Sequence, residues 1–413
     1  MKRLINRWER DANFRIIVLI LAITLFGIIL LSSQSREMQW ENHPSDFGTR
    51  DFVAFWSAFH TLNDGNNPYS LSEIYPFQSH VIADEGSVQA FLNPPWSLAV
   101  LAPILAFDFN EARFLWIALN ILFVYITTFI ISSYLHGDKS GKSNLFLAGL
   151  LFLPSLWALW YGQLSIFLTA CFVGAFSATL KGRGKLAGLL FIPLTIKPHL
   201  FLVVGIVLII YILRKKYIDL LVSFIAGFSA LQLVTYFLYP QLYANWISME
   251  FSPLISKTAS LVTLLRESIV SISGVLIDWP VVAVPMVGLV VSTPWFIKRL
   301  ADSELELLIP ASLCISLGIA PYVMPYDFSL LLICQTTLLI FMNRVDADNS
   351  IRLEIAFMLI GLQLAIIVVG SLIQGLQYYF WIPWAMLVIW FRSLRLLNNG
   401  KVRLFYYSQQ RTQ

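Results

Sequence analysis

Long apolar stretches with almost no charged residue recur along the whole chain. Most have about the length that a helix needs to cross the hydrocarbon core of a bilayer, roughly 20 residues. Helices are favoured there because they satisfy their own backbone hydrogen bonds. The pattern predicts about twelve membrane spans, at residues 14–31, 114–135, 145–160, 164–180, 186–197, 200–213, 217–239, 279–297, 304–322, 327–342, 353–374 and 377–391. We therefore predict an all-α polytopic membrane protein with a single domain over residues 1–413.

Composition supports this class and narrows the chemistry. Hydrophobic residues make up 58% of the chain and charged residues 13%, whereas soluble domains carry about 25% charged residues. The three cysteines, Cys171, Cys314 and Cys334, all lie in apolar stretches, which predicts neither a disulfide framework nor a zinc site. We find no glycine-rich phosphate loop and no metal-ligand spacing. The sequence predicts no cofactor, no metal and no nucleic-acid partner.

Basic residues set the predicted orientation in the bilayer. Cytoplasmic loops carry an excess of Lys and Arg. If residues 91–107 do not cross, most of the 28 Lys and Arg residues fall on one side, together with both termini. We predict a multi-pass protein of the inner (plasma) membrane with cytoplasmic termini, a basic cytoplasmic tail at 392–413 and a large outer loop at 33–113. A crossing at 91–107 would place Lys181, Arg183 and Lys185 outside, and its three prolines favour a juxtamembrane or re-entrant helix.

The outer loop contains a second short amphipathic segment. Its apolar residues recur at helical spacing, at Phe52, Phe55, Phe59 and Leu62. Thr49 is a candidate N-cap, and the turn residues 63–68 end the helix. We expect this helix to lie in the membrane interface with its apolar face toward lipid. Asp51 then lies in the first turn, where it could act on a lipid-linked substrate or simply complement the positive end of the helix.

Polar residues of several outer turns complete the candidate site. The spans on either side of Lys197 are short, so this turn lies below the outer membrane surface, where a charge needs a partner. A carboxylate can take a proton from an attacking hydroxyl, and a cation can stabilise a phosphate leaving group. Asp51 is the candidate catalytic base and Lys197 the candidate phosphate ligand. The other candidate substrate-binding residues are Gln163, His199, Asp327, Tyr69, Tyr326 and Arg266, and Lys257 is a further possible cation.

Structural roles remain open for several of these residues. Lys197 could extend to the surface as long basic side chains do near a membrane. Gln163 could satisfy backbone groups of its turn, and Asp327 could be the N-cap of the following span. His199, next to a proline, could be a structural hydrogen-bond donor.

The same residues form a recognisable series. Arg50-Asp51-Phe52, the segment 64–69, Asn93-Pro94-Pro95, Tyr161-Gly162-Gln163-Leu164, the segment 186–198 and the segment 321–327 occur in this order. Together they resemble glycosyltransferase family 87, which contains polyprenol-phosphate-mannose-dependent mannosyltransferases of the GT-C superfamily. The resemblance covers most of residues 48–330.

The resemblance implies a GT-C-type helical bundle with juxtamembrane helices in its first outer loop and a catalytic aspartate at Asp51. It implies a polyprenyl-phosphate-linked sugar donor, with mannose as the sugar, and an inverting transfer. The expected function is transfer from this donor to a hydroxyl of a glycolipid or glycan acceptor on the outer face. Asn93 stands where the family usually has tyrosine, and Tyr322 and Tyr326 stand where a histidine sometimes occurs. The alternatives are a non-enzymatic carrier or flippase of polyprenyl-linked glycans, and a structural partner in an envelope complex.

Overall fold

The described part of the chain is built from helices. The computed structural model describes residues 50–81, 88–135, 142–249, 258–275, 278–300, 305–344, 349–373 and 375–399. Its α-helices are α3 (Phe52–Asn63), α4 (Leu71–Ser79), α5 (Trp96–Leu105), α6 (Phe109–Tyr134), α7 (Lys142–Leu150), α8 (Leu153–Tyr161), α9 (Ser165–Leu180), α10 (Gly184–Phe191), α11 (Leu202–Lys215), α12 (Ile218–Leu238), α13 (Gln241–Ile247), α15 (Leu261–Ser273), α16 (Trp279–Arg299), α17 (Leu305–Ile319), α18 (Leu332–Arg344), α19 (Asn349–Leu372) and α20 (Ile382–Asn399). Tighter 3₁₀ turns are η3 (Ile192–Ile196), η4 (Pro198–Phe201), η5 (Pro325–Leu331) and η6 (Leu376–Tyr379). These residues contain no strand, which agrees with the predicted all-α class.

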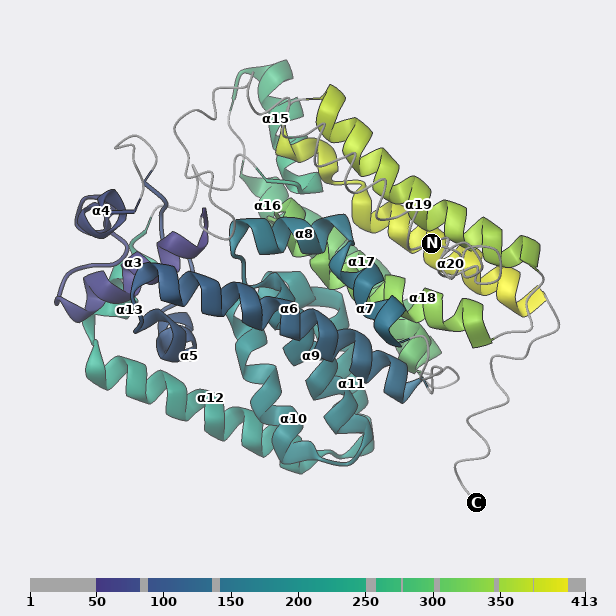
Figure 1. Cartoon of the computed structure of the whole chain (residues 1–413), viewed down its shortest axis with the longest axis horizontal. Coiled ribbons are helices and arrows are strands. Elements are labelled where there is room, and N and C mark those ends of the chain that lie inside the picture. The colour runs from purple at the N-terminus through teal and green to yellow at the C-terminus, as the bar shows by residue number, and fades with distance from the viewer. Residues whose placement is uncertain are drawn as a thin grey trace, which may run out of the picture.

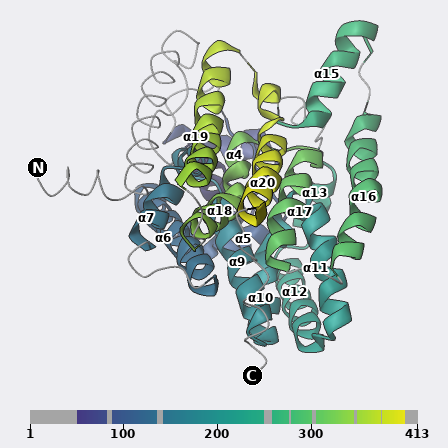
Figure 2. The same ribbon diagram turned by 90° about the vertical axis from the view of Figure 1, so that its right-hand side faces the viewer.

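Seven helical segments in the described residues are long and apolar enough to span a membrane: Phe109–Tyr134, Pro198–Lys215, Ile218–Leu238, Trp279–Arg299, Pro325–Met342, Asn349–Leu372 and Leu376–Leu397. An eighth is possible if the bent pair α7 and α8 counts as one span. The chain is therefore a multi-pass membrane protein by the length and composition of its helices. Figure 1 shows α19 and α20 side by side at one end, and Figure 2 shows α15 and α16 in line along one edge.

The predicted count of about twelve spans is not confirmed. The predicted first span at 14–31 lies outside the described residues. Helices do form at 165–180, 184–196 and 307–319, but each is shorter than 18 residues. Helix α20 continues through Asn399, eight residues beyond the predicted end of the last span at 391, and the start of the cytoplasmic tail at 392 stays a prediction. The rest of the basic tail lies outside the described residues.

The break between α7 and α8 is supported by glutamines from two other helices. The two helices meet at an angle of 62°, and Pro154 starts α8. Gln363 Oε1 accepts a hydrogen bond from the Leu153 N–H at 3.1 Å, and Gln335 Nε2 donates to the Ala148 carbonyl at 2.9 Å. Broken helices persist at membrane depth only where their freed backbone groups find such partners. This break determines the direction of α8 and therefore where its C-terminal end lies.

Helix α3 packs on the protein itself through the face that we predicted. Phe52 stacks on Trp116 of α6 with ring centroids 6.1 Å apart, and Phe55 meets Phe91 edge-on at 6.1 Å. Phe52, Phe55 and Leu62 are buried. The expectation that this face points to lipid is therefore corrected, because α6, α5 and the segment before α5 cover it. Figure 1 shows α3, α4, α5 and α13 grouped at one side of the molecule.

Close contact between α10 and α12 shapes the segment that leads to Lys197. A Cβ at Gly188 would lie 2.5 Å from the Leu220 carbonyl oxygen and 2.8 Å from the Phe224 nitrogen. Glycine is therefore required for this approach. After α10 the chain tightens into η3 and η4, which flank Lys197. The residue before a proline is disfavoured in the α region, so Lys197, which precedes Pro198, separates the two 3₁₀ turns.

Candidate active site

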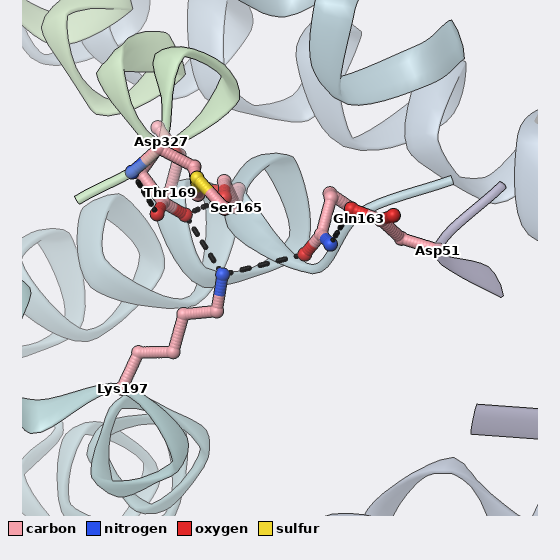
Figure 3. Close-up of polar contacts among 7 residues, drawn as sticks. Asp51, Gln163, Ser165, Thr169, Lys197 and Asp327 are labelled. Carbon is pink, nitrogen blue, oxygen red and sulfur yellow. Dashed lines mark hydrogen bonds and ion pairs between the residues drawn. The ribbon is translucent and has the colours of Figure 1, made fainter. Parts of the chain in front are cut away.

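Four of the predicted site residues form one continuous chain of polar contacts. Asp51 precedes α3, Gln163 follows α8, Lys197 separates η3 from η4, and Asp327 lies in η5. Figure 3 shows the Lys197 side chain extending into the space between Asp327 and Gln163, with Asp51 on the far side of Gln163. Four segments that are distant in sequence thus meet at one point of the bundle.

The C-terminal end of α8 places Gln163 beside Asp51. Gly162 ends this helix in the left-handed conformation, with φ of 70°, which glycine adopts without steric cost. The Gln163 N–H then bonds back to the Ala158 carbonyl at 2.9 Å. The Asp51 N–H donates to the Tyr161 carbonyl, also at 2.9 Å. These backbone bonds tie the start of α3 to the Tyr-Gly-Gln turn.

The Gln163 side chain links the two charged groups. Its Nε2 donates a short hydrogen bond to Asp51 Oδ2, and its Oε1 accepts from Lys197 Nζ at 3.3 Å. Gln163 is buried, with 5% of its surface exposed. Its amide therefore bridges side chains instead of satisfying the backbone of its turn, which was the structural alternative.

Lys197 and Asp327 form a buried ion pair, with Lys197 Nζ 2.8 Å from Asp327 Oδ1. Ser165 Oγ donates to the same oxygen at 2.5 Å, and the Met324 N–H donates to Oδ2 at 3.0 Å. Asp327 is the N3 residue of a capping box whose N-cap is Met324, so the alternative of an N-cap at Asp327 is wrong by position. The carboxylate caps the turn and holds the lysine at once. The alternative that Lys197 extends to the surface does not fit this arrangement.

Aromatic rings and a second cationic side chain lie beside the chain of contacts from Asp51 to Asp327. The rings of Tyr161 and Tyr326 have centroids 5.6 Å apart. The Arg50 guanidinium lies over the Tyr161 ring at 5.2 Å, and Lys197 Nζ lies 5.2 Å from the centroid of Tyr326. Sequence reasoning selected Tyr326 but assigned no role to Arg50 or Tyr161. Their position in the motifs around Asp51 and Gln163 was the available signal.

The Asp51 side chain does not cap the helix that follows it. Asp51 is the N-cap residue of α3, but its side chain makes no capping hydrogen bond. The expected N-cap Thr49 lies outside the described residues. Burial raises the pKa of the Asp51 carboxyl, and the Gln163 hydrogen bond, Arg50, a Tyr326 hydrogen bond and Lys197 act in the opposite direction. The residue as a whole is half-buried.

His199 and Arg266 are buried and incompletely bonded. The His199 ring lies 3.8 Å from that of Tyr322, and its Nε2 has no hydrogen-bond partner in the structure. Arg266 on α15 has 3% of its surface exposed and pairs with Asp278 at 2.5 Å. Its Nε and Nη1 have no partner among the described residues. Buried donors normally do have partners, which makes both side chains candidates for ligand contact.

Backbone contacts bring the start of α15 to the late turn. The Ala259 N–H bonds to the Val323 carbonyl at 2.6 Å, and Ser260 Oγ to the Pro321 carbonyl at 3.4 Å. Arg266 therefore projects from a helix whose start is anchored beside the turn that carries Asp327. Lys257, the other predicted cation of this loop, lies outside the described residues.

Tyr69 belongs to a separate set of contacts. Its hydroxyl donates to the Asn93 carbonyl at 2.8 Å, and its ring lies 5.3 Å from that of Phe91. These contacts join the turn after α3 to the segment before α5. The predicted substrate-binding role of Tyr69 stays a prediction.

Among the described residues, no group of three or more His, Cys, Asp or Glu side chains could hold a metal ion. The three cysteines are free and buried.

The fold and site define a multi-helix membrane protein in which a half-buried aspartate, Asp51, is bonded to a buried polar network. The family model of glycosyltransferase family 87 matches residues 91–325. This is more than half of the chain, and the chain belongs to that family; it is a membrane glycosyltransferase. The matched range includes Gln163, Lys197 and Arg266, whereas Asp51 lies before it and Asp327 just after it. No curated protein and no solved structure matches the chain.

Proposed function

We propose that this glycosyltransferase moves a sugar, with mannose as the expected one, from a polyprenyl-phosphate donor to an acceptor hydroxyl by inverting single displacement. The acceptor class is a glycolipid or glycan, and the bundle is of the GT-C type. The reaction takes place on the outer face of the plasma membrane, with both termini in the cytoplasm. Support for the orientation comes from the distribution of Lys and Arg along the chain.

The observation that carries the proposal is the environment of the Asp51 carboxylate, meaning its hydrogen-bond partners and its burial. Its carboxylate is not used to cap α3, it is oriented by Gln163, and the residue remains partly accessible. Burial raises the pKa of this carboxyl, which makes it a stronger base when ionised. A general base needs both an accessible lone pair and a pKa close to the working pH.

The proposed reaction is a single substitution at the anomeric carbon. The acceptor oxygen attacks the anomeric carbon as its proton passes to Asp51. The bond between that carbon and the phosphate oxygen breaks, and polyprenyl phosphate leaves with the bonding electrons. Because the attack comes from the side opposite the phosphate, a β-linked donor gives an α-glycoside. Charge accumulates on the phosphate, where a fixed cation stabilises the transition state.

Arg266 is the cation that best fits the phosphate. Its guanidinium is buried, and two of its nitrogens have no partner in the part of the chain that the structure describes. Arginine presents donors in a fork that matches phosphate oxygens. Lys197, the residue first expected in this role, is already paired with Asp327. Its direct contact with phosphate stays a prediction, which an experiment below separates from a second role.

Transfer of labelled mannose from polyprenyl-phosphate-mannose to total membrane lipid tests the proposal. We expect labelled product with the parent enzyme, none with Asp51→Asn, and parental activity with Asp64→Asn, which removes an exposed carboxylate at the other end of α3. Equal transfer by Asp51→Asn and the parent would remove Asp51 from the chemistry. Donor binding without transfer in the presence of any membrane acceptor would favour the alternative of a carrier or flippase.

A further inference from the structure

The contacts that join Asp327 to Asp51 start from one donor, Lys197, which donates toward both ends. Asp327 accepts from Lys197, Lys197 donates to Gln163, and Gln163 donates to Asp51. Figure 3 shows these four side chains in that order. Each link joins one donor to one acceptor.

The two neighbours of Gln163 determine which way its amide points. A lysine ammonium can only donate, and an ionised carboxylate can only accept. Lys197 therefore requires the amide oxygen on its side, and Asp51 requires the amide nitrogen on the other. An amide with a single available neighbour could rotate and present its oxygen to Asp51, which would repel the carboxylate.

Lys197 is itself held in place. Its partner Asp327 has 1% of its surface exposed and also accepts from Ser165 Oγ and the Met324 N–H. The ammonium also faces the Tyr326 ring. Three partners thus engage Lys197, and its charge is balanced by a carboxylate that is fixed to two other segments.

We propose that Gln163 is a positioning residue that keeps Asp51 ionised and oriented, and that the Lys197–Asp327 pair acts on Asp51 through the orientation of the Gln163 amide. This role rests on the proposed function of Asp51 as the base. It assigns the ion pair to the acceptor side of the reaction, whereas contact with phosphate would assign Lys197 to the donor.

The pKa of the Asp51 carboxyl distinguishes the positioning role of the ion pair from a contact between Lys197 and the donor phosphate. The groups that face this carboxyl are Gln163, Arg50, Tyr326 and Lys197, and each favours its ionised form against the effect of burial. Tyr161 contributes its backbone carbonyl to the Asp51 N–H. Removing the Gln163 donor raises the pKa of Asp51. The acid limb of the pH profile, where kcat/KM falls because Asp51 becomes protonated, therefore moves to higher pH.

The experiment compares pH profiles of kcat/KM for the parent, Gln163→Met and the double variant Lys197→Met with Asp327→Asn. The double variant removes both charges together, so neither is left unpaired. We expect Gln163→Met to raise the acid limb by about one pH unit, the usual effect of losing one hydrogen bond to a charged group. The double variant moves the limb in the same direction. Gln78→Met, which removes a buried amide bonded to Ser57 and Gln89, keeps the parental limb.

Combining all three substitutions gives the decisive result. If the ion pair acts through Gln163, the triple variant shifts the limb no further than Gln163→Met alone, because the intermediary is already missing. Additive shifts would overturn the proposal. So would an unchanged acid limb in the double variant accompanied by a tenfold loss of affinity for polyprenyl-phosphate-mannose, since that result assigns Lys197 to the donor.

A second readout separates failure of this proposal from failure of the proposed function. Infrared titration of the Asp51 carboxyl, identified by its loss in Asp51→Asn, needs no substrate. An upward shift of about one pH unit in Gln163→Met supports the positioning role even if the parent transfers nothing from polyprenyl-phosphate-mannose. No shift in this titration overturns the positioning role, whatever the transfer assay shows.

Discussion

Neutralising Asp327 alone should destabilise the protein far more than neutralising it together with Lys197. In Asp327→Asn the lysine ammonium stays buried, with 8% of the residue exposed, and loses its counter-ion. Breaking a buried pair from one side costs about 3–5 kcal/mol of the free energy of unfolding. The Asp327 carboxylate also accepts hydrogen bonds from Ser165 Oγ and the Met324 N–H. An asparagine reproduces these contacts only in part. We therefore expect a loss of about 4 kcal/mol.

The double variant Lys197→Met with Asp327→Asn should lie within about 1 kcal/mol of the parent, because replacing a whole buried pair by neutral groups of similar size is often nearly neutral. The assay is equilibrium unfolding in detergent, arranged as a double-mutant cycle. Glu354→Gln is the control. It breaks the Arg392–Glu354 pair, whose side chains are 50% and 42% exposed, and should cost less than about 1 kcal/mol.

Two results would refute this reasoning. One is a cost for Asp327→Asn no larger than that for Glu354→Gln, which would mean that the pair is solvated. The other is a double variant that loses the sum of the two single losses, which would mean that the two charges do not depend on each other.

Four other predictions follow. Gly188→Ala should cost at least about 1–3 kcal/mol because its Cβ meets backbone atoms of α12, whereas Gly205→Ala, with no atom within 4 Å of its Cβ, should not destabilise; thermal unfolding compares the two. Gln363→Leu leaves a backbone N–H of the α7–α8 break unpaired and should cost about 1–3 kcal/mol in the same assay. Since the folded-state pKa of Asp51 is raised, ionising it costs stability, so Asp51→Asn should have the higher unfolding midpoint above neutral pH, a gain that disappears below the ordinary carboxyl pKa of 3.8. Arg266→Gln should weaken donor binding about tenfold, the usual cost of losing one charge-assisted hydrogen bond; unchanged affinity in a direct binding measurement would exclude the phosphate role.

Class and family were readable from the sequence because both depend on local information. Apolar stretches predict helices in a membrane whatever their partners are, since no other arrangement satisfies the backbone there. The helix after Asp51 was predicted from the spacing of Phe52, Phe55, Phe59 and Leu62, and it begins and ends close to the predicted positions. The family motifs were likewise local, and the family model, which matches residues 91–325, confirms the family.

What covers a helix and where a broken helix turns are not local properties. The apolar face of α3 was expected to meet lipid, but a Phe side chain is equally well buried against lipid or against Trp116. The 62° break between α7 and α8 depends on Gln335 and Gln363, which lie far along the chain. The short helices around Lys197 similarly depend on the approach of α12 at Gly188.

The sequence by itself determined which side chains were available for chemistry: an aspartate before an amphipathic helix, a glutamine after a glycine, a lysine before a proline and an aspartate in a proline-rich turn. Only the tertiary structure decided that these four residues form one continuous chain of polar contacts, with Lys197 bonded to Asp327 and Gln163 and not extended to the surface. The physical reason is that a hydrogen bond or ion pair depends on separations of about 3 Å between atoms. Four segments far apart in sequence reach such separations only after the whole bundle has packed.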